Sequence, residues 1–180
     1  QDILRSDDKG RVLVVDQTVG DMSVSLGGAT ALSFQQMLAA ALDENPDATI
    51  YVKTHPKVSS GHKGGYYSMV ASDARVVLLR EPANPLSLIT RMDRVYVVTS
   101  TMGFEALLAG KPVTCFGTPW YAGWGATDDR NIAAEVRTRR ARSRSVRELF
   151  IAAYLSYSRY LNPETRQTGD ISHVISWLEL

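Results

Sequence analysis

Residues 95–125, VYVVTSTMGFEALLAGKPVTCFGTPWYAGWG, decide the predicted fold. The apolar run at the start of this stretch ends in Thr99, Ser100 and Thr101. A Leu/Ala-rich segment over 102–109 then predicts a short helix, and a second apolar run follows it. The first N–H groups of a helix have no partner within the helix, and anions such as phosphate bind there. The stretch therefore predicts strand, helix and strand with an anion site, although an ordinary capped helix would explain TSTMG equally well.

Four residues around this helix start have predicted roles in ligand binding. Ser100 or Thr101 can cap the helix and also donate a hydroxyl to the ligand, while Gly103 lets the ligand approach. Glu105 lies one turn further on and faces the same side, where its carboxylate suits the hydroxyls of a ribose. We predict that these four residues bind the phosphate and the nucleotide of a ligand.

Five short apolar runs alternate with helical patterns along the chain. They are apolar on both faces, as expected for a parallel sheet that helices cover on both sides. Helices are expected over 29–44, ended by Asn45 and Pro46, over 85–92 and, more weakly, over 66–72. The expected strands are 11–16, 48–54, 75–79, 94–98 and 111–116. The pattern predicts an α/β fold, a Rossmann-like open and mainly parallel five-stranded sheet that binds ligands at the carboxyl ends of its strands.

Length and composition favour one domain without an obvious macromolecular partner. The 180 residues are 44% hydrophobic, enough for one core, and the net charge of +1 does not favour binding to nucleic acid. Cys115 is the single cysteine, which excludes a disulfide framework and suits a cytoplasmic setting. No acidic residues cluster at metal-binding spacing, so no metal is predicted. No apolar run is long enough for a membrane span, and no signal peptide is recognised.

A single domain over 1–180 is expected, with a core of about 11–136. Two C-terminal helices are predicted, over 145–161 with Ser145 as cap and Glu148 in the capping-box position, and over 170–180 with Asp170 as cap. Because the chain begins with Gln rather than Met, we expect it to be a piece of a longer protein.

Two further residues are candidates for catalysis. His55 follows the predicted second strand and precedes a proline, which holds it extended at the strand end, where it can donate to a phosphate. A structural loop histidine is the alternative. Asp21 follows the first strand and offers a nucleophile or base, or else it bonds its own backbone in a turn. Whether Asp16 or Asp21 faces the ligand stays open. No GxGxxG or P-loop motif supports a nicotinamide or ATP-hydrolysing enzyme.

The segment FGTPWYAGWGATDDR, residues 116–130, combines aromatic rings with glycines. Such rings can form rigid walls for a sugar or a base, and a packed loop with an aromatic lid is the alternative. Asp128, Asp129 and Arg130 are interpreted as a helix start with an exposed ion pair. The five arginines within 137–144 are interpreted as a solvated segment, with an anionic glycan or membrane surface as the alternative ligand.

Four motifs together resemble the KpsC/LipB family of bacterial capsular polysaccharide proteins. They are DQTVGDMS, KTHP, VTSTMGFEALLAGKPV and FGTPWYAGWGATDDR, and the resemblance spans about residues 11–160. Members of this family are retaining β-Kdo glycosyltransferases that use CMP-Kdo and have two Rossmann-like lobes. This chain resembles the second lobe, the C-terminal lobe of a GT-B glycosyltransferase. The shorter HP and Ser/Thr motifs are also similar to those of bacterial sialyltransferases.

The resemblance implies roles for the residues that match. His55, Ser100 and Thr101 would bind the CMP phosphate, Glu105 the ribose, and Asp21 would act as the nucleophile of a double displacement. The acid/base group would lie in the first lobe. The implied substrate-binding residues are Gln17, Trp120, Tyr121 and Trp124.

The expected function is the CMP-Kdo-binding lobe of a β-Kdo transferase in capsular polysaccharide biosynthesis and transport, inactive without its other lobe. The expected partners are a CMP-sugar donor, an anionic lipid-linked glycan acceptor, the N-terminal lobe and, peripherally, the inner face of the inner membrane. No cofactor besides the donor is expected. The alternatives are a noncatalytic glycan-binding or assembly module, and a transferase for another CMP-activated acidic sugar.

Overall fold

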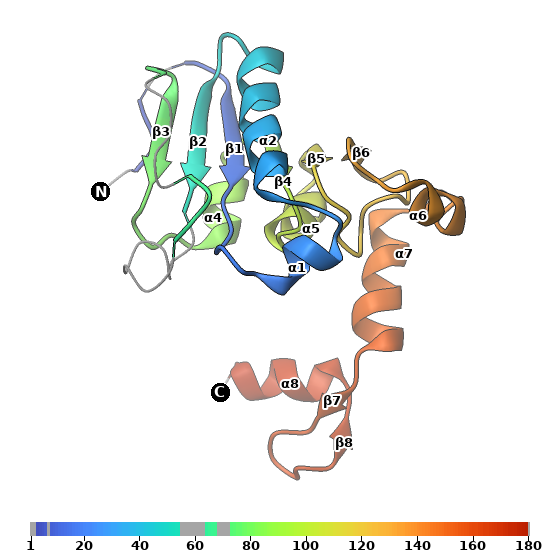
Figure 1. The fold of residues 1–180 in the computed structure, drawn as a ribbon. Coiled ribbons are helices and arrows are strands. Elements are labelled where there is room, and N and C mark those ends of the chain that lie inside the picture. Colours follow the sequence, from blue (N-terminus) through green and yellow to red (C-terminus); the bar gives the residue numbers. More distant parts are fainter. Residues whose placement is uncertain (1–2, 7, 55–63, 68–72, 180) are drawn as a thin grey trace. The chain divides into compact units, whose positions relative to one another are not determined.

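The computed structural model describes residues 3–6, 8–54, 64–67 and 73–179. The chain divides into two units, Gln1–Ser143 and Arg144–Leu180. The first unit contains the predicted sheet and the motifs around it, and Figure 1 follows the chain through its elements.

Six parallel strands form the sheet of the first unit, in the order β3-β2-β1-β4-β5-β6. Their bounds are β1 Arg11–Val15, β2 Thr49–Lys53, β3 Val76–Leu79, β4 Arg94–Val97, β5 Val113–Cys115 and β6 Asp128–Asp129. The first five are the predicted strands, so the Rossmann-like fold class is confirmed. The number five is wrong, because β6 pairs with β5 at the edge of the sheet.

The sixth strand replaces the helix start that was expected around Asp128. Asp128 and Asp129 lie opposite Thr114 and Cys115, so the main chain of this segment bonds to β5. Arg130 does form the expected ion pair with Asp128, at 2.7 Å. Two adjacent aspartates have low strand propensity, and only the neighbouring strand makes this segment extended.

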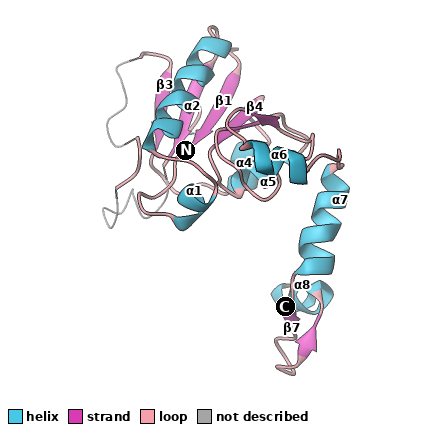
Figure 2. Ribbon diagram, turned by 45° about the vertical axis from the view of Figure 1, so that its right-hand side comes forward, coloured by secondary structure: helices cyan, strands magenta, loops and turns pink. Residues whose placement is uncertain are grey.

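Helices pack on both faces of the sheet. Among the described residues of the first unit, the helices are α1 Met22–Leu26, α2 Ala31–Glu44, α4 Pro85–Ile89, α5 Met102–Leu108 and α6 Ala134–Arg139. One face is occupied by α2 and the other by α4 and α5 (Figure 1 and Figure 2). The α2 face holds a buried cluster in which Phe34 and Met37 of α2 pack with Val14 of β1 and Val52 of β2.

Three of these helices lie close to their predicted positions, and α2 ends at Asn45 as predicted. Helices α1 and α6 were not predicted from the sequence. Of the weak helix expected over 66–72, Tyr66 and Tyr67 lie in a turn, and residues 68–72 lie outside the described residues.

The second unit contains two helical segments and a hairpin. Helix α7 Val146–Phe150 continues as the π-helix η1 Ile151–Tyr157, and the capping box of Ser145 with Glu148 is present. The helix expected over 145–161 ends at Tyr157, because residues 160–161 pair as β7 with β8, Thr168–Gly169. Helix α8 Ile171–Leu178 begins at the predicted cap, Asp170.

Among the described residues, no helix has the length and apolar character needed to span a membrane.

Candidate functional site

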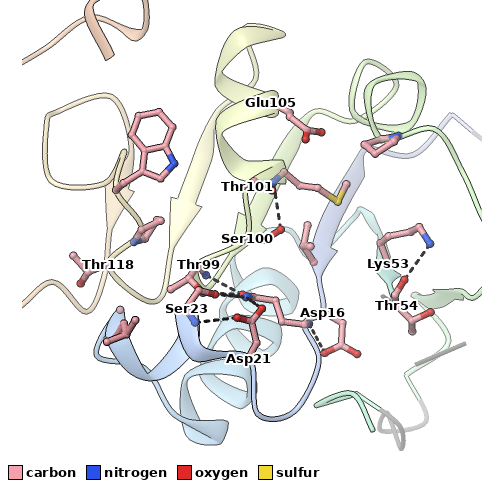
Figure 3. Close-up of a pocket in the computed structure, with 18 of the residues that line it drawn as sticks. Asp16, Asp21, Ser23, Lys53, Thr54, Thr99, Ser100, Thr101, Glu105 and Thr118 are labelled. Carbon is pink, nitrogen blue, oxygen red and sulfur yellow. Dashed lines mark hydrogen bonds between the residues drawn. The ribbon is translucent and has the colours of Figure 1, made fainter. Parts of the chain in front are cut away.

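A cavity of about 740 Å³ lies at the carboxyl ends of the strands of the first unit. Its volume is in the range of small-molecule sites, and its position is the one where open parallel sheets bind ligands. Side chains from the ends of β1, β2 and β4, from the loop after β5 and from α1 and α5 line it (Figure 3). The predicted site residues that line it are Gln17, Asp21, Ser100, Thr101, Glu105 and Trp120.

The hydroxyls of Ser100 and Thr101 have different environments at the start of α5. Ser100 Oγ accepts a hydrogen bond from the Met102 N–H at 3.3 Å. Thr101 occupies the N-cap position, but its side chain makes no capping hydrogen bond and is exposed. Ser100 therefore does the capping that was predicted for either residue, and the Thr101 hydroxyl can serve a ligand. Glu105, one turn further along α5, lines the same cavity.

Gly103 and Tyr121 lie behind this wall of the cavity and do not line it. Tyr121 is fully buried, and its hydroxyl donates to the main-chain oxygen of Ser100. A Cβ on Gly103 would overlap that hydroxyl and lie 2.9 Å from the ring carbon that bears it. Gly103 thus makes room for Tyr121, whereas the sequence suggested that it makes room for a ligand. Tyr121 in turn holds the main chain at Ser100.

The side chain of Gln17, after β1, forms hydrogen bonds with Thr99, after β4, at the base of the cavity. Its side chain is 4% exposed, Oε1 accepts from the Thr99 N–H at 3.0 Å, and Nε2 donates to Thr99 Oγ1 at 3.0 Å. The same Nε2 lies 3.3 Å from Asp21 Oδ2 and 3.2 Å from Ser23 Oγ. Both the oxygen and the nitrogen of the Gln17 amide thus form hydrogen bonds within the protein. In this structure the amide orients its neighbours and leaves no free donor for a substrate.

Asp21 makes the local backbone contact that the sequence offered as one alternative, and it also lines the cavity. Its Oδ1 accepts from the Ser23 N–H at 2.9 Å, which makes it the N-cap of α1, and its carboxylate also lines the cavity. Asp16 lines the cavity as well, but it is 2% exposed and its Oδ1 accepts main-chain hydrogen bonds from Gln17 and Tyr66. Asp21 is thus the more accessible of the two carboxylates.

His55 lies outside the described residues, but the two residues before it line the cavity. The side chain of Lys53 is 7% exposed, and its Nζ donates to the main-chain oxygens of Thr54 and Glu81, both at 3.1 Å. Burial lowers the pKa of Lys53 below its ordinary value. Sequence reasoning missed Lys53 as a cavity residue. Its position at the end of a strand buried on both faces was the available signal.

The aromatic loop contributes one ring to the cavity rather than three. Trp120 lines it and packs on Phe104 of α5, with 4.4 Å between ring centroids. Trp124 does not line it, and its Nε1 donates to the main-chain oxygen of Trp120. Arg140 also lines the cavity. It belongs to the arginine run that was interpreted as solvated, with an anionic glycan or membrane surface as the alternative ligand.

Within the described ranges, no group of three or more His, Cys, Asp or Glu side chains could hold a metal ion. Cys115 is fully buried, and burial raises the pKa of its thiol, so it has no thiolate to offer the site.

Comparison with known proteins identifies the family. A family model described as "Capsule polysaccharide biosynthesis protein" matches residues 2–160. The chain belongs to this family of capsule polysaccharide biosynthesis proteins. The sequence-based resemblance is therefore confirmed at the level of the family.

Curated relatives of this family member are longer than the chain. It is 54% identical over 178 residues to the capsule polysaccharide modification protein LipA of Neisseria meningitidis serogroup B. The aligned region covers 97% of the chain and 25% of LipA. It is 38% identical over 173 residues to the lipopolysaccharide-processing protein LpsZ of Rhizobium meliloti, covering 96% of the chain and 38% of LpsZ. The chain thus spans well under half of each relative.

Two solved structures share the fold of this capsule protein. One is KpsC of Thermosulfurimonas dismutans, a β-Kdo 2,4 transferase, with 49% identity and a TM-score of 0.89 over 97% of the chain and 53% of the KpsC chain. The other is a β-Kdo 2,7 transferase of KpsC from the same organism, with 30% identity and a TM-score of 0.76 over 97% and 54%.

Proposed function

We propose that this chain is the CMP-Kdo-binding lobe of a retaining β-Kdo glycosyltransferase of capsular polysaccharide biosynthesis. The observation that carries the proposal is that Asp21, Ser100, Thr101 and Glu105 line one cavity at the strand ends. The 49% identity to a β-Kdo 2,4 transferase supports the choice of sugar. The donor is the substrate, and the proposal includes no further cofactor.

In this proposal the hydroxyls of Ser100 and Thr101 bind the phosphate of CMP, and Glu105 binds the ribose. The Thr101 hydroxyl is exposed at the cavity and makes no capping bond, which leaves it able to donate. Donors fixed at the leaving phosphate stabilise the charge that develops there, so the proposed reaction requires no metal. His55, although outside the described residues, is assigned to the same phosphate because it directly follows the cavity residue Thr54.

Asp21 is the proposed nucleophile. In the first step its carboxylate oxygen forms a bond to the anomeric carbon of Kdo, and the bond from that carbon to the phosphate oxygen breaks and releases CMP. In the second step an acceptor hydroxyl attacks the same carbon and the carboxylate leaves. Each step inverts the configuration at the anomeric carbon, so the two steps together retain it. The Ser23 N–H and the Gln17 side-chain amide donate hydrogen bonds to the Asp21 carboxylate and orient it for this attack.

The second step also needs a group that accepts the proton of the acceptor hydroxyl. We assign this group, and the binding of the glycan acceptor, to the remainder of the longer protein, since the chain covers 53% of the similar KpsC chain. The chain alone is then expected to bind donor without completing transfer. A cytoplasmic location with peripheral contact to the inner membrane stays a prediction.

The first test is a titration of the ¹⁵N-labelled chain with CMP. Amide shifts are expected at Ser100, Thr101 and Glu105, and a surface at the strand ends that does not respond would refute the proposal. Glu105→Gln should weaken CMP binding without weakening the binding of inorganic phosphate, whereas Glu135→Gln on the exposed face of α6 should change neither. Binding of capsule glycan without binding of CMP would favour the noncatalytic module.

The second test uses the full-length transferase. Asp21→Ala should lower transfer by at least about 10³-fold, as expected for the loss of a covalent nucleophile, and should leave CMP binding intact. Transfer that persists near the wild-type rate would remove the role assigned to Asp21.

A further inference from the structure

One arginine of the run 137–144 differs from the others in its environment. Arg137, Arg139 and Arg142 are exposed, and Arg144 pairs with Glu148 at 3.1 Å. Arg140 is half-buried at the end of α6 and lines the cavity at the strand ends. The run is therefore not a uniform solvated segment, and one of its charges belongs to the candidate site.

The loop after β5 fixes the guanidinium of Arg140. Its Nη1 donates to the main-chain oxygens of Pro119 at 2.8 Å and Ala122 at 2.6 Å. Its Cζ lies 5.6 Å from the centre of the Trp124 ring, within the range of a cation–π contact. These contacts hold the head group in one place while using only one of its three nitrogens.

The other two nitrogens have no acceptor in the part of the chain that the structure describes. Over those ranges Arg140 makes hydrogen bonds through Nη1 alone and forms no ion pair. Asp129 is the nearby acid that acts on Arg140 electrostatically, but its carboxylate accepts from the Gly123 N–H and the Thr127 hydroxyl. Nε and Nη2 thus form one side of a planar fork that suits a two-oxygen anion.

The charge of Arg140 is incompletely compensated. Burial lowers the pKa of Arg140, and the neighbouring Arg139 lowers it further. A guanidinium nevertheless stays protonated at neutral pH. Because a partly desolvated cation without a counter-ion costs free energy, a bound anion at this position would recover part of that cost.

We infer that Arg140 binds an anionic group of the sugar nucleotide, a carboxylate or a phosphate, through Nε and Nη2. This inference rests on the proposed function and adds a residue to the same site. Since Asp16, Asp21 and Glu105 also line the cavity, an acidic ligand is repelled over much of its surface. Arg140 contributes a positive charge at the loop after β5, where the anionic group of the ligand is attracted.

Calorimetric titration of the chain with CMP and with CMP-Kdo tests the inference. Arg140→Gln should weaken binding of CMP-Kdo by about 10- to 100-fold, the range for a hydrogen bond to a charged group. If the anion is the sugar carboxylate, the affinity for CMP stays unchanged, and if it is the phosphate, both ligands weaken equally. The matched control Arg137→Gln, on the exposed side of α6, should change neither affinity.

The salt dependence of binding and circular dichroism distinguish an Arg140 that binds the ligand anion from an Arg140 that only stabilises the loop after β5. The wild-type affinity should fall with salt more steeply than that of Arg140→Gln, and the near-UV circular dichroism of the tryptophans should match in the wild type and in Arg140→Lys, which keeps a cation beside Trp124. Arg140→Lys keeps the positive charge but lacks the two-nitrogen fork, so it should bind CMP-Kdo with intermediate affinity. If Arg140→Gln does not fold, the affinity of Arg140→Lys provides the test instead.

The results overturn the two proposals separately. Equal affinities of wild type and Arg140→Gln for both ligands, or equal salt dependence, would overturn the role of Arg140 and leave the proposed function standing. A wild-type chain that binds neither CMP nor CMP-Kdo would overturn both.

Discussion

Replacement of Gln17 by methionine tests whether the floor of the cavity is built as described. Methionine keeps the length of the side chain and removes the amide. The Thr99 N–H, which donates its hydrogen bond to Gln17 Oε1, would then be buried without that acceptor. An unpaired buried donor costs about 1–3 kcal/mol, and the longer bond from Nε2 to Asp21 is lost as well. We expect the free energy of unfolding of the first unit to fall by about 2–3 kcal/mol.

Urea denaturation measures this loss. Trp177 lies in the second unit, so Trp177→Phe leaves Trp120 and Trp124 as reporters of the first. With a urea dependence of about 2 kcal/mol per molar, the midpoint should fall by about 1–1.5 M. Gln35→Met, at an exposed position of α2, is the matched control and should change the free energy of unfolding by less than about 0.5 kcal/mol. A midpoint for Gln17→Met equal to that of the control would refute the stabilising role assigned to the Gln17 hydrogen bonds.

Two further predictions concern the packing and the protonation of the site. Gly103→Ala should destabilise the first unit by about 1–3 kcal/mol, because the new Cβ would overlap the Tyr121 hydroxyl and lie 3.0 Å from Val97 Cγ2. In the double variant with Tyr121→Phe the overlap is relieved, so a double-mutant cycle should give a total loss smaller than the sum of the single losses, and additive losses would contradict the packing. Lys53 has a lowered pKa in the folded chain, so the unfolded chain binds more protons between that pKa and 10.5. The stability of the wild type relative to Lys53→Met should therefore rise as the pH increases toward 10.5, and urea midpoints that keep a constant difference over this range would exclude the effect.

The sequence by itself determined the five strands and the position of the site along the chain. Runs such as 11–16 and 94–98 are apolar on both faces, which is a local signal for a buried parallel strand. The cap at Asp170 and the capping box at Ser145 were also local, since each involves residues three positions apart. Strand ends of a parallel sheet meet at one edge, so Asp21, Ser100, Thr101 and Glu105 could be predicted to share a cavity.

Only the tertiary structure decided which side chains face that cavity. Gln17 and Thr99 are 82 residues apart in the chain, and no periodicity in either segment indicates that one side chain engages the other. In the same way, β6 is extended because β5 lies beside it, and Gly103 is required because Tyr121 packs against it from the loop after β5. The difference between Arg140 and its neighbours in the arginine run also depends on that loop, because two of its carbonyl oxygens accept hydrogen bonds from the Arg140 guanidinium. Local sequence encodes backbone conformation, whereas the orientation of a side chain depends on residues that folding brings from elsewhere in the chain.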